Sequence, residues 1–210
     1  MHLLSAYANW LHLRWPAGRV ERLPVVDEAG GCSVAGVSIA GDLAGVPLLK
    51  FSLDTGAKAA QRAAEAILAM PPGEGATIDV AIIGGGVAGM AAAAECARRK
   101  LRFTVIEAGE PFTTIANFPV AKPIFTYPKA MTPAGVLQVG ATVKEALLEE
   151  LRAQIAPLDI PVTHATATHV ERRNGALAVM LADGAPILAR RVIVAIGRSG
   201  NFRRLGVTGE

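Results

Sequence analysis

A glycine-rich turn lies where a buried strand is expected to meet a helix, and its chemistry suits the phosphates of a dinucleotide. Asp79-Val-Ala-Ile-Ile is followed by Gly84, Gly85, Gly86, Val87, Ala88 and Gly89, and then by an alanine-rich stretch. In such a turn the first glycine allows the tight bend, the second lets the pyrophosphate approach the backbone, and the third lets helix and strand pack closely. The start of the helix offers unpaired N–H groups to the phosphates. We therefore expect this turn to bind a dinucleotide.

An acidic residue follows at the spacing that ribose recognition requires. Phe103-Thr-Val-Ile-Glu107 predicts a second strand, which places Glu107 and the adjacent Ala108 about 20 residues beyond the glycines. A carboxylate there can accept hydrogen bonds from the two ribose hydroxyls. The alternative is a glycine turn without a ligand in an ordinary α/β domain. We favour the dinucleotide because strand, turn, helix, strand and acid occur in the required order.

The elements that must position these residues follow from hydrophobic periodicity and from glycine and proline breakers. Helices are predicted over about 48–70, 87–99 and 142–157, the last opened by a capping box, Thr142-x-x-Glu145. Strands are predicted over 36–42, 79–83, 103–107 and 191–197. An antiparallel meander is predicted over 162–173, 176–182 and 186–189, with hairpin turns at Asn174-Gly175 and Asp183-Gly184. The long irregular stretch 108–140 (the excursion) has a length that usually indicates function.

Composition and length restrict the class of protein. The chain has 210 residues, 51% of them hydrophobic, and a net charge of +3 without a long basic run, so no nucleic-acid partner is expected. The two cysteines, Cys32 and Cys96, form no CxxC pair, so neither a redox dithiol nor a metal site is expected. With so few cysteines, the default compartment is a reducing cytoplasm. No transmembrane segment is expected, and residues 1–15 predict an amphipathic helix that docks on this domain or on a partner. We expect one domain over 1–210, made of segment 1–70, a linker at 71–77 and the main unit at 78–210.

Three stretches together resemble the FAD-binding domain of thioredoxin-reductase-like flavoproteins, the two-dinucleotide pyridine nucleotide-disulfide oxidoreductase superfamily. The glycine turn with Glu107 is similar to the start of that domain, and Val192-Ile-Val-Ala-Ile-Gly197 after a meander is similar to its second signature. Gly36-Val-Ser-Ile-Ala-Gly41-Asp42 resembles its closing motif, although Gly-Asp alone would predict only a turn. The resemblance implies a Rossmann-like α/β fold of three layers, with a parallel sheet and a small meander. It also implies FAD, held at its pyrophosphate by the glycines, at its adenosine ribose by Glu107 and at its ribityl chain by Asp42, with Gly197 near the flavin.

The excursion is similar to that of the subset of this superfamily that resembles bacillithiol-disulfide reductases and lacks a CxxC pair. In that subset the loop lies near the flavin. Thr114 and Asn117 are therefore interpreted either as polar contacts to the flavin or as ordinary loop caps.

Three departures from the family pattern affect the functional hypothesis. The Gly-Asp motif precedes the glycine turn instead of closing the protein, Lys100 replaces a customary glycine, and no second GxGxxG follows. The chain is therefore interpreted as a circularly permuted domain or as a fragment that joins two modules. A domain whose ends lie close together tolerates such reordering.

The resemblance implies an FAD-dependent oxidoreductase, or its FAD-binding module, that passes electrons from NAD(P)H to an unidentified acceptor. Its NAD(P)H site is not expected in this chain, so partners include an NAD(P)H-binding domain, an acceptor protein or a second copy in a homodimer. The alternatives are a free-standing FAD domain that meets a diffusing reductant and a non-catalytic nucleotide-binding module that docks on a partner. No general base is evident, and His164 and His169 are interpreted as surface residues of the meander.

Overall fold

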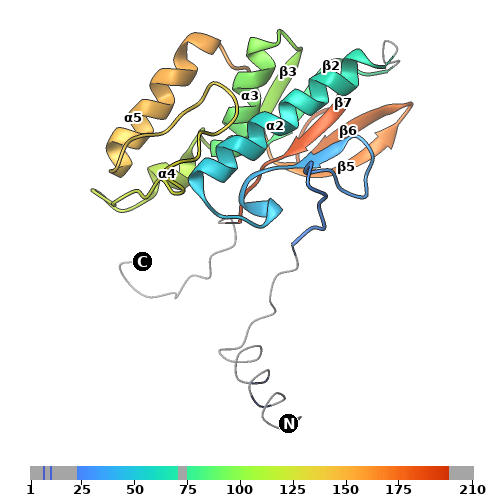
Figure 1. Cartoon of the computed structure of the whole chain (residues 1–210). Helices are drawn as coiled ribbons and strands as arrows, with labels where there is room; N and C mark the ends of the chain where they lie inside the picture. Colours follow the sequence, from blue (N-terminus) through green and yellow to red (C-terminus); the bar gives the residue numbers. More distant parts are fainter. Residues whose placement is uncertain (1–6, 8–9, 11–22, 71–74, 199–210) are drawn as a thin grey trace, which may run out of the picture.

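The computed structural model describes residues 7, 10, 23–70 and 75–198 (Figure 1). The expected leading helix, apart from Tyr7 and Trp10, lies outside the described residues, as do positions 71–74 of the expected linker and the tail beyond Arg198. No helix of the described part is long and apolar enough to cross a membrane.

A mixed sheet forms the centre of the fold. Its strands are β1 (Val37–Ile39), β2 (Ile78–Ile83), β3 (Phe103–Glu107), β4 (Val162–His164), β5 (Ala167–Arg173), β6 (Ala176–Leu181) and β7 (Ile187–Val194). The strand order is β4-β3-β2-β7-β6-β5, and β1 pairs with β7 off this path. The neighbours β4–β3, β3–β2, β2–β7 and β1–β7 are parallel, whereas β7–β6 and β6–β5 are antiparallel. The predicted combination of a parallel sheet with a small meander is confirmed.

Strand β7 holds the two parts of the chain together. Its first half pairs with the meander, with Ala189 opposite Leu177, and its second half pairs with β1, with Val192 opposite Val37. Its other edge pairs with β2 from Ala189 to Val194. The early segment that contains Gly41 and Asp42 therefore joins the same sheet as the glycine turn.

The helices are α2 (Leu49–Leu68), α3 (Val87–Arg98), α4 (Thr113–Ala116) and α5 (Lys144–Ile155), with short 3-10 turns at Gly41–Ala44 and Ala156–Leu158. Side chains of α2, α3 and α5 form one core cluster with Val80, Ile82 and Ile193 of the sheet. A second cluster includes Ala81, Ile83 and Val192 and adds Leu177 and Val179 of the meander. Because Ile82 and Ile83 are adjacent in β2, the two clusters lie on opposite faces of the sheet, and the three expected layers are present.

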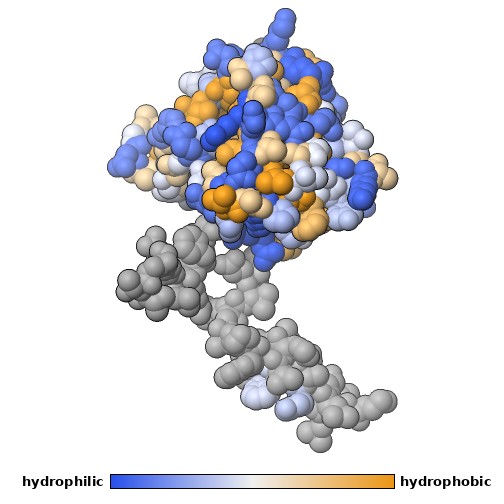
Figure 2. All heavy atoms as spheres, turned by 90° about the vertical axis from the view of Figure 1, so that its left-hand side faces the viewer, coloured by the Kyte–Doolittle hydropathy of each residue, from blue (hydrophilic) through white to orange (hydrophobic). Residues whose placement is uncertain are grey.

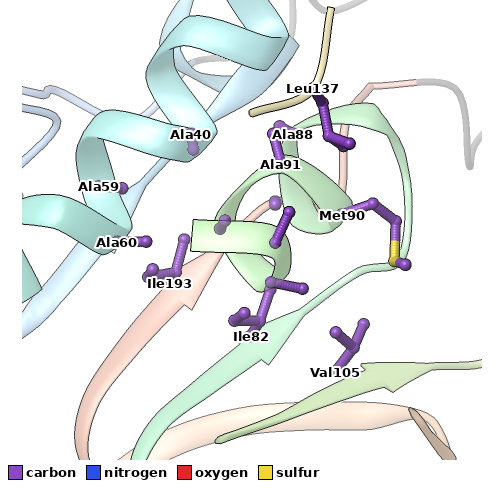
Figure 3. Packing of buried hydrophobic residues seen from close by; sticks show 14 of the residues in the cluster. Ala40, Ala59, Ala60, Ile82, Ala88, Met90, Ala91, Val105, Leu137 and Ile193 are labelled. Atoms are coloured by element: carbon purple, nitrogen blue, oxygen red, sulfur yellow. The ribbon is translucent and has the colours of Figure 1, made fainter. Parts of the chain in front are cut away.

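Small residues let α2 and α3 approach each other closely. Figure 3 shows the labelled alanines of both helices facing each other above Ile82 and Ile193. A Cβ on Gly56 would lie only 2.0 Å from the carbonyl oxygen of Ala88. The glycine that interrupts the predicted helix 48–70 is therefore required by this contact.

Three local predictions are wrong. The capping box does not form, because α5 begins at Lys144 and the Glu145 carboxylate accepts a hydrogen bond from the distant N–H of Ala121 (3.1 Å). Residues 162–164 are not part of the meander, because they form the parallel edge strand β4. The predicted division between strands 186–189 and 191–197 is absent, because β7 runs unbroken through Arg190. The predicted reversal at Asp183-Gly184 is present, since both residues lie in the connection 182–186 between the antiparallel strands β6 and β7. The hairpin at Asn174-Gly175 is confirmed, with positive φ at both residues.

Candidate functional site

The predicted binding residues meet at the carboxyl edge of the sheet. The parallel strands β1, β2, β3 and β7 end there side by side, and the N–H groups of Ala40, Gly84 and Ala195 extend the hydrogen-bonded ladder just beyond the strand ends. In open α/β sheets, ligands bind in the crevice outside these carboxyl ends. The structure therefore brings Gly41, the glycine turn and Glu107 to one edge.

Two of the three glycines of the GxGxxG pattern are required by packing within the chain. Gly84 has a φ of +103°, and a Cβ there would lie 2.5 Å from the carbonyl oxygen of Ala195. A Cβ on Gly89 would lie 1.8 Å from the carbonyl oxygen of Gly84. Both positions exclude a side chain whether or not a ligand binds.

Gly86 differs from these two glycines. Its φ is −72°, which any residue can adopt, and a Cβ there would meet nothing within 4 Å. The chain itself thus gives no steric reason for glycine at this position. The open space in front of Gly86 lies at the start of α3, where a pyrophosphate would bind.

Helix α3 begins with its N-terminal N–H groups directed at this space. Gly86 is the N-cap residue and supplies no side chain, and the first turn contains no acidic residue. The first N–H groups of a helix have no partner within the helix and carry the positive end of its dipole. This helix end is suited to a phosphate.

Glu107 lies directly against the turn. Its Oε2 accepts a hydrogen bond from the N–H of Gly85 (2.5 Å), and its Oε1 accepts one from the N–H of Gly109 (2.8 Å). A carboxylate has about four lone-pair sites, so two hydroxyl donors can still be accommodated. Ala108, which follows, is exposed.

The Gly41–Asp42 pair reaches the same place from the early part of the chain. Gly41 has a φ of +77°, and a Cβ there would lie 2.8 Å from the Cβ of Ala88 in the first turn of α3. Its N–H donates to the hydroxyl of Thr55 (2.9 Å), and the hydroxyl of Ser52 donates to Asp42 Oδ1 (2.9 Å). The motif is therefore fixed against the glycine turn by residues of α2.

The excursion also packs on the turn. The N–H of Phe112 donates to the carbonyl oxygen of Gly85 (3.0 Å), and α4 follows immediately. Thr114 of this short helix and Asn117, its C-cap residue, are both exposed. Gly197 lies two residues beyond Ala195, with a φ of +64°. The structure thus places the segments of these three residues at the carboxyl edge.

Sequence reasoning missed three residues of α2. Ser52 and Thr55 position the Gly-Asp motif, and Lys50, which is 8% exposed, holds the excursion by donating to the carbonyl oxygens of Pro128 (3.0 Å), Lys129 (3.3 Å) and Met131 (2.7 Å). For Lys50 the sequence did contain a signal: a lysine in the first turn of a helix is unusual, because the helix dipole disfavours a cation there.

The excursion also forms a large part of the surface beside α5. Figure 2 views this side of the molecule and shows hydrophobic residues at the lower edge of the folded body and at places higher up, between hydrophilic ones. Phe125 and Tyr127 are 72% and 51% exposed, and their rings stack with centroids 6.5 Å apart.

No group of three or more metal-ligating side chains occurs among residues 23–70 and 75–198, and His164 and His169 are exposed.

Comparison with known proteins agrees with this geometry. The model of a family described as pyridine nucleotide-disulphide oxidoreductase matches residues 81–210, a range that includes the glycine turn and Glu107 but not Gly41 or Asp42. A ferredoxin–NADP reductase of Gluconacetobacter diazotrophicus is 39% identical over 126 residues, which are 58% of this chain and 33% of that protein. One of Gluconobacter oxydans is 34% identical over 122 residues, 57% of this chain and 33% of that protein. The chain therefore spans about a third of the length of these curated relatives.

A solved structure shows the same fold. The bacillithiol disulfide reductase of Staphylococcus aureus superposes with a TM-score of 0.50 at 23% sequence identity, covering 63% of this chain and 42% of that one. At this identity the likeness concerns the fold.

Proposed function

The chain belongs to the pyridine nucleotide-disulphide oxidoreductase family, and on this premise we propose that it is the FAD-binding part of an oxidoreductase. It would pass electrons from NAD(P)H to an acceptor. The names of the two curated relatives suggest ferredoxin as that acceptor. Bound FAD would supply the redox chemistry by accepting a hydride and returning electrons singly or in pairs.

The observation that best supports the proposal is the open space at Gly86. Packing explains Gly84 and Gly89, but nothing in the chain lies where a Gly86 side chain would extend. A backbone without a side chain, beside unpaired N–H groups at the start of α3, fits a pyrophosphate. Together with the family membership this favours a dinucleotide over a turn without a ligand.

The other residues would hold the remaining parts of FAD. We propose that Glu107 binds the adenosine ribose through its unused lone pairs. Asp42 would bind the ribityl chain, with its orientation fixed by Ser52. Gly197, Thr114 and Asn117 lie in segments at the same edge and would border the flavin.

We also propose that the whole chain forms one FAD domain with a circularly permuted motif order. The support is the parallel pairing of β1 with β7 and the contact between Gly41 and Ala88, which bring the Gly-Asp motif to the glycine turn. The NAD(P)H site would be supplied by another segment or another chain.

The test is an FAD titration of the wild type and of Gly86→Val, followed by flavin fluorescence. The extended backbone at Gly86 suits a valine, and a Cβ there has no protein atom within 4 Å, so the melting temperature should change little. Its side chain would enter the pyrophosphate space, and overpacking of about 3 kcal/mol would weaken FAD binding about 100-fold. Gly140→Ala, in an exposed loop with only an ordinary contact, is the control and should bind FAD as the wild type does. Unchanged FAD affinity in Gly86→Val would refute the assignment of this turn.

A second candidate function is favoured by the limited length of the match. Since the chain spans 33% of the curated relatives, it is alternatively a nucleotide-binding module without catalysis that docks on a partner. Because the NAD(P)H site would lie in another segment or chain, NADPH is added to the FAD-loaded native protein together with that segment or chain, and this separates the two. Bleaching of the flavin absorbance band supports the oxidoreductase, whereas tight FAD binding without bleaching supports the module.

A further inference from the structure

Arginine side chains surround a small cavity at the amino edge of the sheet, away from the candidate FAD site. The cavity has a volume of about 60 Å3, and its walls include Arg172 of β5 and Arg190 and Arg191 of β7. Ala35, just before β1, and Ala76, just before β2, also line it. Because β1 and β2 are parallel, this is the end of the sheet opposite to the glycine turn.

Arg190 has a structural role at this place. Its side chain is 11% exposed, and its Nη2 donates to the carbonyl oxygens of Ile67 (3.2 Å) and Met70 (3.5 Å) at the end of α2. Its Nη1 lies 3.9 Å from Asp79 Oδ1. A cation at the C-terminal end of a helix is favourable, so Arg190 stabilises α2.

Among the described residues, Arg172 and Arg191 have neither a helix end nor a carboxylate that offsets their positive charge. Arg191 Nη1 donates to the carbonyl oxygen of Arg190 (3.0 Å), and its Nη2 lies 2.8 Å from the thioether sulfur of Met70, a weak acceptor. Arg172 Nη2 donates to the carbonyl oxygen of Ala35. Among the residues that the structure describes, no carboxylate lies within ion-pairing distance of either guanidinium. Burial, together with the like charges of Arg190 and Arg172, lowers the pKa of Arg191.

We propose that this cavity binds a small inorganic oxyanion, of the size of phosphate or sulfate, between the guanidinium groups of Arg172 and Arg191. Guanidinium groups bind oxyanions through pairs of parallel N–H donors. A cavity needs about 15 Å3 for each water, so this one has room for about four waters, or for one tetrahedral oxyanion. The anion would offset the repulsion between the arginines and connect α2, the meander and the segment before β1. The inference does not depend on FAD binding.

The test is thermal unfolding of the full-length protein in millimolar phosphate against chloride at equal ionic strength, with and without FAD. A ligand that binds only the folded state raises the melting temperature, and we expect a rise of a few degrees for the wild type in both samples. The rise should be lost in Arg191→Met and in Arg172→Met. Arg172 is exposed, so its replacement should leave the fold intact.

Arg173→Met is the matched control. Arg173 is the next residue of β5, points to the other face and pairs with Glu171 (2.5 Å), so its replacement should preserve the phosphate response. An equal rise in all four proteins would show that phosphate acts as an excluded kosmotrope and would overturn the proposal, as would the absence of any rise in the wild type. Isothermal titration of the wild type and Arg172→Met with phosphate should give a saturable heat for the wild type alone.

Discussion

At the scale of single residues, Lys100 occupies a backbone conformation that normally requires glycine. It follows the C-cap of α3, its φ is +56°, and the N–H of Leu101 donates to the carbonyl oxygen of Cys96 (3.0 Å), as in a glycine-terminated helix. We expect Lys100→Gly to raise the free energy of unfolding by about 0.5–1 kcal/mol, because the left-handed conformation costs glycine little. Urea unfolding measures this change. Arg99→Gly, one residue earlier at a φ of −87°, should instead destabilise by a similar amount.

Glu95 of α3 makes stability depend on pH. Its side chain is 1% exposed, and burial alone would raise its pKa, but hydrogen bonds from Arg98 (2.8 Å) and Gln61 (3.3 Å) outweigh burial and lower it. Because the folded pKa is below the unfolded one, the stabilisation is complete above the unfolded pKa of about 4.5 and is lost as the pH falls through the folded value.

Glu95→Gln should therefore lower the free energy of unfolding by about 1–3 kcal/mol at neutral pH, and the difference from wild type should shrink below about pH 4. Urea unfolding at a series of pH values measures it. Glu149→Gln, at an exposed position of α5, serves as the control and should leave the pH profile unchanged. If the free energy of unfolding of Glu95→Gln were below that of the wild type by the same amount at every pH, the proposed link between the ionisation of Glu95 and stability would be wrong.

At the scale of elements, the crossing of α2 and α3 connects the fold to the candidate site. A Cβ at Gly56 would lie 2.0 Å from the carbonyl oxygen of Ala88, a residue of the glycine turn. Gly56→Ala gains about 1 kcal/mol of helix propensity, but separating two packed backbones costs more. We expect a net loss of about 1–2 kcal/mol in unfolding free energy, together with weaker FAD binding. Calorimetry and the FAD titration test both effects, and a stabilised Gly56→Ala would disprove the close crossing.

The elements that sequence reasoning predicted correctly are those specified locally. Strand β3 has the expected bounds, and α3 ends within one residue of the expected position, because their apolar periodicity and glycine breakers lie within the segment. The failures involve distant partners. Glu145 binds the N–H of Ala121 instead of capping its own helix, and Thr163 bonds the hydroxyl of Thr104 (2.9 Å), which helps to place β4 at the sheet edge.

The candidate site shows the same division between local and distant information. The glycine turn and Glu107 belong to one continuous unit, so their proximity follows from spacing alone. The contact of Gly41 with Ala88 depends on the crossing of α2 over α3, which no local pattern specifies. Spacing also does not reveal that Thr55 and Ser52 fix the Gly-Asp motif, since those bonds depend on the turn at Gly41.

At the scale of the whole molecule, the segment 23–70 and the segment 75–198 depend on each other. The early segment contributes β1 to the edge of β7 and covers one face of the sheet with α2, whose side chains share a core with α3. Fully buried Leu53 and Ala60 belong to that core, where a leucine side chain contributes up to about 1.5–3 kcal/mol and an alanine methyl about 0.8 kcal/mol. Contacts other than the peptide link at 71–74 therefore hold the two segments together.

We accordingly expect the two halves to stay associated when that link is cut. A specific protease site inserted at 71–74 allows cleavage of the folded protein, and the products should elute together in gel filtration, retain bound FAD and separate only in denaturant. The half that contains residues 75–198, expressed alone, should aggregate or unfold because the alanine-lined face of α3 would be exposed. Separation of the halves after cleavage, with FAD retained by the later half alone, would show that the Gly-Asp segment does not complete the site and would favour a fragment that joins two modules.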